Sequence, residues 1–123
     1  MARVVHFELG ADDPERAARF WRDAFGWQAE RWQGGSQEYW LLRSGDGEGI
    51  DGGIFRRSDF PVPVSTACTL EVPDADAALA AVEAAGGSVL IPRLAIPGVG
   101  WVAYCRDTEG SVFGLLQRDE PAA

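Results

Sequence analysis

The chain of 123 residues repeats itself at an offset of 61 residues. The residues that coincide at this offset without a gap include Leu9 and Leu70, Asp13 and Asp74, Gly26 and Gly87, Trp40 and Trp101, Asp46 and Asp107, Gly49 and Gly110, and Gly53 and Gly114. Because twice 61 is 122, the repeat accounts for almost the whole length, and two prolines within Asp59–Pro63 separate the halves. We therefore expect one domain, residues 1–123, built from two copies of one supersecondary unit at about residues 1–58 and 64–120.

The first half reads as a strand, a helix and three further strands. Polar and apolar residues alternate over Val4–Leu9, as in a half-buried strand, and Asp13 stands as an N-cap before Pro14. The apolar residues that follow, Ala17, Phe20, Trp21, Ala24 and Phe25, recur at helical spacing. Gly26 suits the left-handed position after a helix. The remaining strands are expected at Gln28–Gln33, Glu38–Arg43 and Ile50–Arg56.

The second half repeats this order. Its elements are expected as a strand at Thr66–Val72, a helix at Ala75–Ala85 capped by Asp74, and strands at Ser88–Ile91, Trp101–Cys105 and Ser111–Gln117. The predicted fold class is therefore α+β, with two βαβββ modules in tandem. One helix per module is expected to cover one face of a four-stranded sheet, through residues such as Phe7 and Leu9, and the other face then curves around a cleft. A function should be sought in that cleft.

Composition narrows the class of partner. The chain has 19 acidic and 11 basic residues, a formal net charge of −8, which argues against nucleic acid or an anionic membrane surface as partner. No run approaches the roughly 20 apolar residues of a membrane span, and His6 and Glu8 interrupt the start before a signal peptide could form. We expect a cytoplasmic protein with a small-molecule ligand. The two cysteines, Cys68 and Cys105, form no CxxC pair and are predicted to be structural thiols.

Several stretches carry a resemblance to a known family. They are the opening from His6 to Trp21 with Phe25-Gly26-Trp27, the segments Glu71–Ala78 and Glu83–Gly87, and the closing segment Asp107–Gly114. In their order and spacing, the whole chain resembles the vicinal oxygen chelate superfamily, also called the glyoxalase, bleomycin-resistance and extradiol dioxygenase superfamily. The resemblance implies the paired βαβββ fold, a small organic ligand in the cleft, and a homodimer.

The resemblance also implies a divalent metal, such as Fe, Mn, Ni or Zn, held by the first and last strands of both modules. Those places correspond to His6, the neighbourhood of Asp51 and Gly53, Ala67, and Gly114. Alanine and glycine have no donor atom, so the predicted metal site is incomplete and His6 is its remaining ligand. A set of His6, Glu8 and Asp51 is an alternative metal site, although side chains two apart on a strand are separated by about 6–7 Å along the strand axis.

His6 and Glu8 are the predicted catalytic residues. His6 is the only histidine in the chain, and imidazole is the side chain best suited to proton transfer near neutral pH. Its alternative role is that of a hydrogen-bonded histidine lining the cleft. In a partly apolar cavity, Glu8 could move a proton at a carbon next to a carbonyl group. Its alternative role is that of a carboxylate on the wetter face of the strand.

Four further residues, Asp51, Thr69, Trp40 and Trp101, are predicted to contact a substrate. Trp101 follows the proline- and glycine-rich loop Ile96–Gly100, which suits the rim of a cleft, and a flat ligand could stack on it or on its repeat mate Trp40. The alternative is that both tryptophans pack between sheet and helix, as is predicted for Trp21 and Trp27. Asp51 has an alternative as a turn residue, because glycines crowd around it.

Three kinds of function agree with these features. The first is an enzyme of the lyase, isomerase or oxygenase type, in which His6 and Glu8 handle protons and the metal is absent or held atypically. The second is a binding protein that sequesters a drug or metabolite, which the missing ligands at Ala67 and Gly114 favour. The third is a structural or regulatory subunit without a ligand, for which the sequence has no positive sign.

Overall fold

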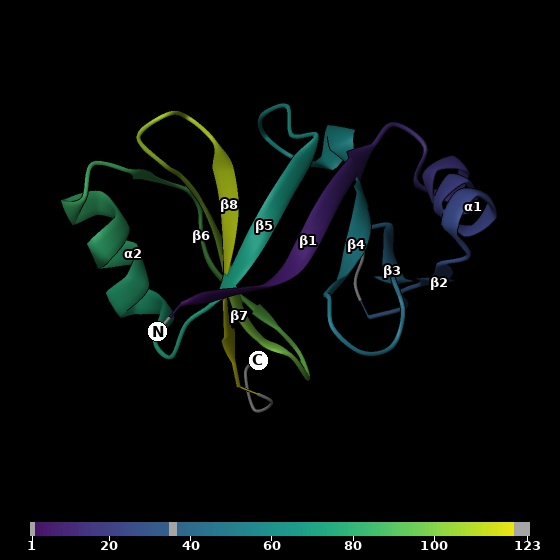
Figure 1. The fold of residues 1–123 in the computed structure, drawn as a ribbon. Helices are drawn as coiled ribbons and strands as arrows, with labels where there is room; N and C mark the ends of the chain where they lie inside the picture. The colour runs from purple at the N-terminus through teal and green to yellow at the C-terminus, as the bar shows by residue number, and fades with distance from the viewer. Residues whose placement is uncertain (1, 35–36, 120–123) are drawn as a thin grey trace. The chain divides into compact units, whose positions relative to one another are not determined.

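The structure, a computed structural model, describes residues 2–34 and 37–119 (Figure 1). The chain forms two compact units, one of His6–Thr66 and one of Met1–Val5 together with Ala67–Ala123. We call them the first and the second module. Neither helix in the described part of the chain is long and apolar enough to span a membrane.

The first module has one helix and four strands. Its elements are β1 (Arg3–Ala11, of which His6 onward belongs to this module), α1 (Pro14–Phe25), β2 (Gln28–Arg31), β3 (Tyr39–Arg43), β4 (Asp51–Arg56) and a short 3-10 helix, η1 (Arg57–Asp59). The strand order is β2-β3-β4-β1, in which β1 is parallel to β4 and the other neighbours are antiparallel. In this register Gly53 of β4 lies between Glu8 of β1 and Leu41 of β3.

The second module repeats the same topology. Its elements are β5 (Thr66–Glu71, of which Ala67 onward belongs to this module), α2 (Ala75–Ala84), β6 (Ser88–Ile96), β7 (Gly100–Arg106) and β8 (Val112–Arg118). The strand order is β5-β8-β7-β6, with β5 parallel to β8. Thr69 lies opposite Gly114, as Glu8 lies opposite Gly53, so even the strand register repeats at the predicted offset. The predicted α+β class with two βαβββ modules is confirmed.

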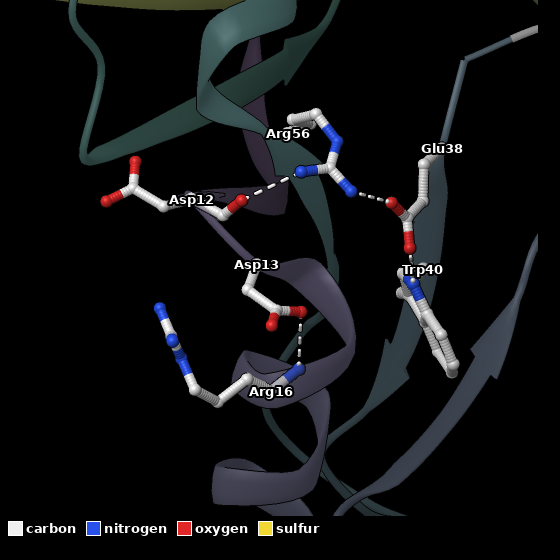
Figure 2. Close-up of polar contacts among 6 residues, drawn as sticks. All are labelled: Asp12, Asp13, Arg16, Glu38, Trp40 and Arg56. Atoms are coloured by element: carbon white, nitrogen blue, oxygen red, sulfur yellow. Dashed lines mark hydrogen bonds and ion pairs between the residues drawn. The ribbon is translucent and has the colours of Figure 1, made fainter.

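The ends of α1 follow the signals in the sequence. The Asp13 carboxylate accepts a hydrogen bond of 3.1 Å from the backbone N–H of Arg16 (Figure 2). Pro14 occupies the first turn. Gly26 ends the helix with φ 72°, a left-handed conformation that favours glycine. Asp74 caps α2 in the same way, through the N–H of Ala77. Local sequence is therefore sufficient to place both helix starts.

Each helix covers one face of its own sheet. The core of the first module consists of Ala11, Ala18, Leu42 and Ile54, with Phe7, Leu9, Trp21, Trp27 and Trp40 packed around them. The core of the second module consists of Val72, Ala103, Cys105 and Leu115, with Leu70, Leu79, Val82 and Phe113 around them. Phe7 and Leu9 point to α1, as the alternation of β1 predicted. Their neighbours His6 and Glu8 therefore project from the face of the sheet opposite α1.

The apolar stripe of α1 is only partly buried. Trp21 and Trp27 stack at 4.8 Å between ring centroids and pack against the first core, as predicted. Phe20 and Phe25 belong to the same stripe but are 56% and 63% exposed. They make edge contacts with each other and Phe25 stacks on Trp21, so the stripe is wider than the area of sheet that it covers.

Strand β6 is longer than predicted. The expected strand ended at Ile91, before Pro92, whereas β6 continues to Ile96. Proline is tolerated there because β6 is the last strand in the order of its module, and the pairing with β7 is irregular between Ile91 and Leu94. Pro92 therefore falls where the hydrogen-bonding ladder is already interrupted.

A network of polar contacts ties the start of β3 to β4 and to the residues before α1 (Figure 2). Arg56 donates a hydrogen bond of 2.8 Å to the backbone carbonyl of Asp12 and pairs with the carboxylate of Glu38. The second oxygen of Glu38 accepts a hydrogen bond of 3.0 Å from Nε1 of Trp40. The hydrogen bond from Trp40, together with the Arg56 guanidinium, holds the pKa of Glu38 below its ordinary value of 4.5, although burial acts in the opposite direction. The network fixes the position of the residue that precedes Tyr39.

Candidate functional site

A cluster of three polar side chains lies on the face of the first module opposite α1. His6 and Glu8 come from β1, where they alternate with the core residues Phe7 and Leu9. Tyr39 comes from the beginning of β3 and extends toward them across β4. We call these three residues the triad.

The triad is connected by short distances. The hydroxyl oxygen of Tyr39 lies 2.9 Å from Nε2 of His6, and the hydroxyl donates to Glu8, at 2.9 Å to Oε1 and 3.2 Å to Oε2. Nε2 of His6 also lies 3.1 Å from Oε1 of Glu8. A carboxylate only accepts hydrogen bonds, so the single hydroxyl proton of Tyr39 goes to Glu8. Nε2 of His6 must then carry a proton and donate it to the Tyr39 oxygen, which leaves Nδ1 as the second ring position.

The two side chains from β1 differ in their access to solvent. The His6 side chain is 27% exposed and that of Glu8 only 8%. A buried carboxylate requires a hydrogen-bond donor, which the Tyr39 hydroxyl supplies, and Nε2 of His6 lies 3.1 Å from Oε1 of Glu8. The partly exposed imidazole of His6 is thus connected, through the Tyr39 hydroxyl, to a buried carboxylate.

The elements around Tyr39 restrain its ring. Trp32, in the connection after β2, meets the Tyr39 ring edge to face at 6.0 Å between centroids. The N–H of Trp32 also donates a hydrogen bond of 2.8 Å to the backbone carbonyl of Tyr39. Glu38, the residue immediately before Tyr39, forms an ion pair with Arg56. Contacts before and beside Tyr39 therefore orient the hydroxyl toward His6 and Glu8.

Asp51 lies next to the triad in register but is engaged elsewhere. It pairs with His6 across β1 and β4, and it is exposed. Its Oδ1 accepts a hydrogen bond of 2.9 Å from the N–H of Ser44, the residue after β3. This contact agrees with the alternative interpretation of Asp51 as a turn residue.

Of the other residues predicted to bind substrate, one belongs to the first module and two belong to the second. Trp40 packs against the core under α1, and its Nε1 donates to Glu38. Thr69 and Trp101 belong to the second module, where Thr69 is buried opposite Gly114. Trp101 shares its face of β7 with the core residues Ala103 and Cys105 and carries the Arg93 guanidinium 4.2 Å above its ring. Their contact with a substrate stays a prediction.

Tyr39 is the member of the triad that the sequence analysis missed. The signal available was the alternation of β3, in which Trp40 and Leu42 enter the core and Tyr39 and Leu41 face the other way. The alternation is visible in the sequence. The register of β3 with β4, which places Tyr39 near Glu8, is not. The pairing of Tyr39 with Phe55 and of Leu41 with Gly53 supplies this register.

The residues of this chain do not fit the metal site that the family resemblance implies. Ala67 and Gly114 have no donor atom, and the carboxylate of Asp51 bonds to Ser44. Within residues 2–34 and 37–119, no three His, Cys, Asp or Glu side chains gather as metal ligands do. Nε2 of His6 and both carboxylate oxygens of Glu8 contact the Tyr39 hydroxyl.

Comparison with known proteins defines the class. The model of the glyoxalase-like domain family matches residues 5–116. The chain belongs to this family, within the vicinal oxygen chelate superfamily. "Putative glyoxylase CFP32" of Mycobacterium tuberculosis (strain CDC 1551 / Oshkosh) is 33% identical over 115 residues, which cover 93% of this chain and 43% of that protein, and the protein of the same name in Mycobacterium bovis matches equally. The chain thus spans less than half the length of these relatives.

Solved structures share the fold. A methylmalonyl-CoA epimerase from Mycobacterium tuberculosis matches with a TM-score of 0.68 at 15% identity, over 94% of this chain and 87% of that one. A structure titled NAD-dependent benzaldehyde dehydrogenase, from Legionella pneumophila, matches with a TM-score of 0.67 at 9% identity, over 93% of this chain and 98% of that one. At these identities the likeness establishes the fold alone.

Proposed function

We propose that this protein is an acid–base enzyme that moves a proton at a carbon next to the carbonyl group of a small organic molecule. The observation that carries the proposal is the triad, in which an imidazole, a phenol and an enclosed carboxylate lie within 2.9–3.2 Å of one another. An exposed base oriented by an enclosed carboxylate is a recurring arrangement in proton-transfer enzymes. Within the described part of the chain, His6, Glu8 and Tyr39 are sufficient to form this arrangement.

His6 is the group that meets the substrate, because its side chain is 27% exposed whereas that of Glu8 is only 8% exposed. Neutral His6 takes the proton from the carbon at Nδ1, and the electron pair of the broken C–H bond moves onto the carbonyl oxygen to form an enolate. The imidazolium that results is stabilised by the carboxylate of Glu8, 3.1 Å from Nε2. Return of the proton by His6 to the same face of that carbon regenerates the substrate with its hydrogen exchanged for one from solvent. Return to a neighbouring atom completes an isomerisation, and either step restores neutral His6.

Glu8 and Tyr39 act through His6. The Glu8 side chain is 8% exposed, so its carboxylate would stabilise an imidazolium formed at His6 in surroundings that screen charge weakly. Tyr39 bridges the two groups and fixes the side of the imidazole that faces Glu8, and hence the tautomer of His6. We assign Tyr39 and Glu8 as positioning residues and His6 as the catalytic residue.

The names of related proteins support the reaction class. The curated relatives are named glyoxylases, and several solved structures of this fold are epimerases. An epimerase inverts a stereocentre, and at a carbon next to a carbonyl this requires removal and return of a proton. The small-molecule ligand, the homodimer and the cytoplasmic location expected from the sequence stay predictions.

Deuterium exchange tests the proposal without knowledge of the natural substrate. The full chain is incubated in D₂O with a panel of aldehydes, 2-oxo acids, hydroxyketones and acyl thioesters, and deuterium at the carbon next to the carbonyl is followed by NMR. We expect accelerated exchange in at least one compound, and a loss of about 10²–10⁴-fold in His6→Gln, the range for removal of a general base. Glu8→Gln should also lower the rate.

Two variants serve as controls. Glu30→Gln makes the same chemical change at an exposed position of β2, and Tyr104→Phe removes a phenolic hydroxyl in the second module. Both should exchange at the wild-type rate. Wild-type exchange in His6→Gln and Glu8→Gln would overturn the proposal. Binding of a panel compound, detected by tryptophan fluorescence, without any exchange would contradict catalysis and support the alternative of a sequestering protein.

A further inference from the structure

Gly53 lies directly beneath the hydroxyl group of Tyr39. A Cβ atom built on Gly53 would overlap the hydroxyl oxygen and Cζ of Tyr39 and would lie 2.7 Å from its Cε2. Real Cβ atoms do not approach other heavy atoms this closely. The side chain of Tyr39 therefore fills the space that any side chain at position 53 would need.

Backbone conformation does not explain the glycine. Gly53 is outside the left-handed region of φ, in contrast to Gly45, Gly47 and Gly49 in the preceding turn. It is buried in the middle of β4, where a residue with a side chain would strengthen a strand. The space that the Tyr39 side chain occupies therefore accounts for glycine at position 53.

The register of β1 with β4 explains how the space above Gly53 brings Tyr39 to the triad. Gly53 is the direct neighbour of Glu8 on β1, so a phenol that crosses β4 at Gly53 arrives at the Glu8 carboxylate. With a side chain at position 53, the hydroxyl would be pushed away from both Glu8 and His6. The missing Cβ is as necessary for the triad as the hydroxyl itself.

We propose that Gly53 is a positioning residue of the triad, the one that admits the Tyr39 hydroxyl to His6 and Glu8. It follows that Tyr39 in this position and any side chain at position 53 exclude each other. The proposal concerns how the triad is assembled and holds whether or not the triad performs the proposed reaction. Its test therefore uses spectroscopy and stability in place of activity.

The second module has a milder form of the same arrangement. A Cβ atom on Gly114 would lie 2.8 Å from Oγ1 of Thr69 and 3.3 Å from Cε1 of Tyr104. Gly114 and Thr69 are the repeat mates of Gly53 and Glu8. In both modules a hydroxyl-bearing side chain thus closes the space above the glycine, but only the first module places an imidazole and a carboxylate beside that hydroxyl.

The single histidine makes the triad visible by NMR. Because His6 is the only histidine, a ¹H–¹⁵N spectrum of the imidazole region contains the signals of one ring. We expect Tyr39→Phe and Gly53→Ala to displace these signals in the same direction, since both remove the Tyr39 hydroxyl from Nε2. Gly87→Ala is the control, because its Cβ would collide with Val82 and with the carbonyl oxygen of Arg106, both in the second module. It should destabilise the protein and leave the His6 signals in place.

A rescue experiment keeps the proposal testable if Gly53→Ala folds poorly. When Tyr39 is first replaced by alanine, the obstacle to a side chain at position 53 is gone. Gly53→Ala should lower the urea midpoint of unfolding in the wild-type background and have no such effect in the Tyr39→Ala background. An equal loss in both backgrounds, or His6 signals in Gly53→Ala that coincide with the wild type, would overturn the proposal.

Discussion

Removal of the Tyr39 hydroxyl should destabilise the fold, because Glu8 depends on it. The Glu8 side chain is 8% exposed, and its partners in the triad are the Tyr39 hydroxyl at 2.9 Å and Nε2 of His6 at 3.1 Å. A hydrogen bond to a charged group contributes about 1.5–3 kcal/mol. Since His6 stays beside Glu8 in Tyr39→Phe, the loss should fall at the lower end, about 1.5–2 kcal/mol.

Urea unfolding followed by tryptophan fluorescence measures this loss, and the chain has five tryptophans as reporters. The same substitution is then made in a Glu8→Gln background, where the acceptor is no longer charged. We expect the cost of Tyr39→Phe to fall there to about 1 kcal/mol or less, the value for a neutral hydrogen bond. A cost below about 0.5 kcal/mol in the wild type, or the same cost in both backgrounds, would refute the assignment of Tyr39 as the main donor to Glu8.

Three further outcomes follow from the structure. The pKa of Glu38 is lowered in the folded state, so its ionised form stabilises the protein above its ordinary pKa of 4.5, and this contribution is lost as the pH falls through the folded-state value. Glu38→Gln should thus be less stable than the wild type by about 1 kcal/mol at pH 7, and urea midpoints should converge in acid. Leu42→Ala, at a side chain 1% exposed, should cost about 2–5 kcal/mol in the same assay. Burial raises the pKa of the Cys105 thiol, so a thiol reagent should label only Cys68 in the native protein and both cysteines in urea.

The parts of the fold that could be predicted are those encoded locally. Asp13 and Asp74 stand three residues before the N–H groups that they cap, and Gly26 ends α1 without help from distant residues. The alternation of β1 likewise separates Phe7 from His6 over a few positions. The repeat supported some of these observations a second time, because Asp13 recurs as Asp74 and Gly26 as Gly87.

The triad could be predicted only in part, because it joins residues that are distant in sequence. His6 and Glu8 were found from their spacing on one strand. Tyr39 is 31 residues from Glu8, and its contact depends on the register of β3 with β4 and on the space above Gly53. Neither the strand register nor the space above Gly53 can be predicted from a short segment of sequence.

The sequence also did not determine the direction in which some side chains point. The sequence left Trp40 and Trp101 undecided between the core and an open face, because the phase of a short strand is set by pairing with its neighbour. Pairing of Trp40 with Ile54, a core residue, places Trp40 under α1. For Asp51 the deciding contact was the N–H of Ser44, seven residues away across a turn.

The two modules have diverged at the site although they share one fold. Positions His6 and Glu8 of the first module correspond to Ala67 and Thr69 of the second, so the ionisable groups are confined to one copy. Duplication explains the fold, and the loss of symmetry identifies where chemistry is expected. Known proteins of this fold carry different names, and the side chains of the triad, more than the fold, define the proposed reaction.

The most direct measurement compares deuterium exchange at the carbon next to a carbonyl by the wild type, His6→Gln and the control Glu30→Gln. We expect exchange by the wild type and Glu30→Gln at equal rates, and a loss of at least about 10²-fold in His6→Gln. Equal rates in all three proteins would contradict proton transfer by the triad.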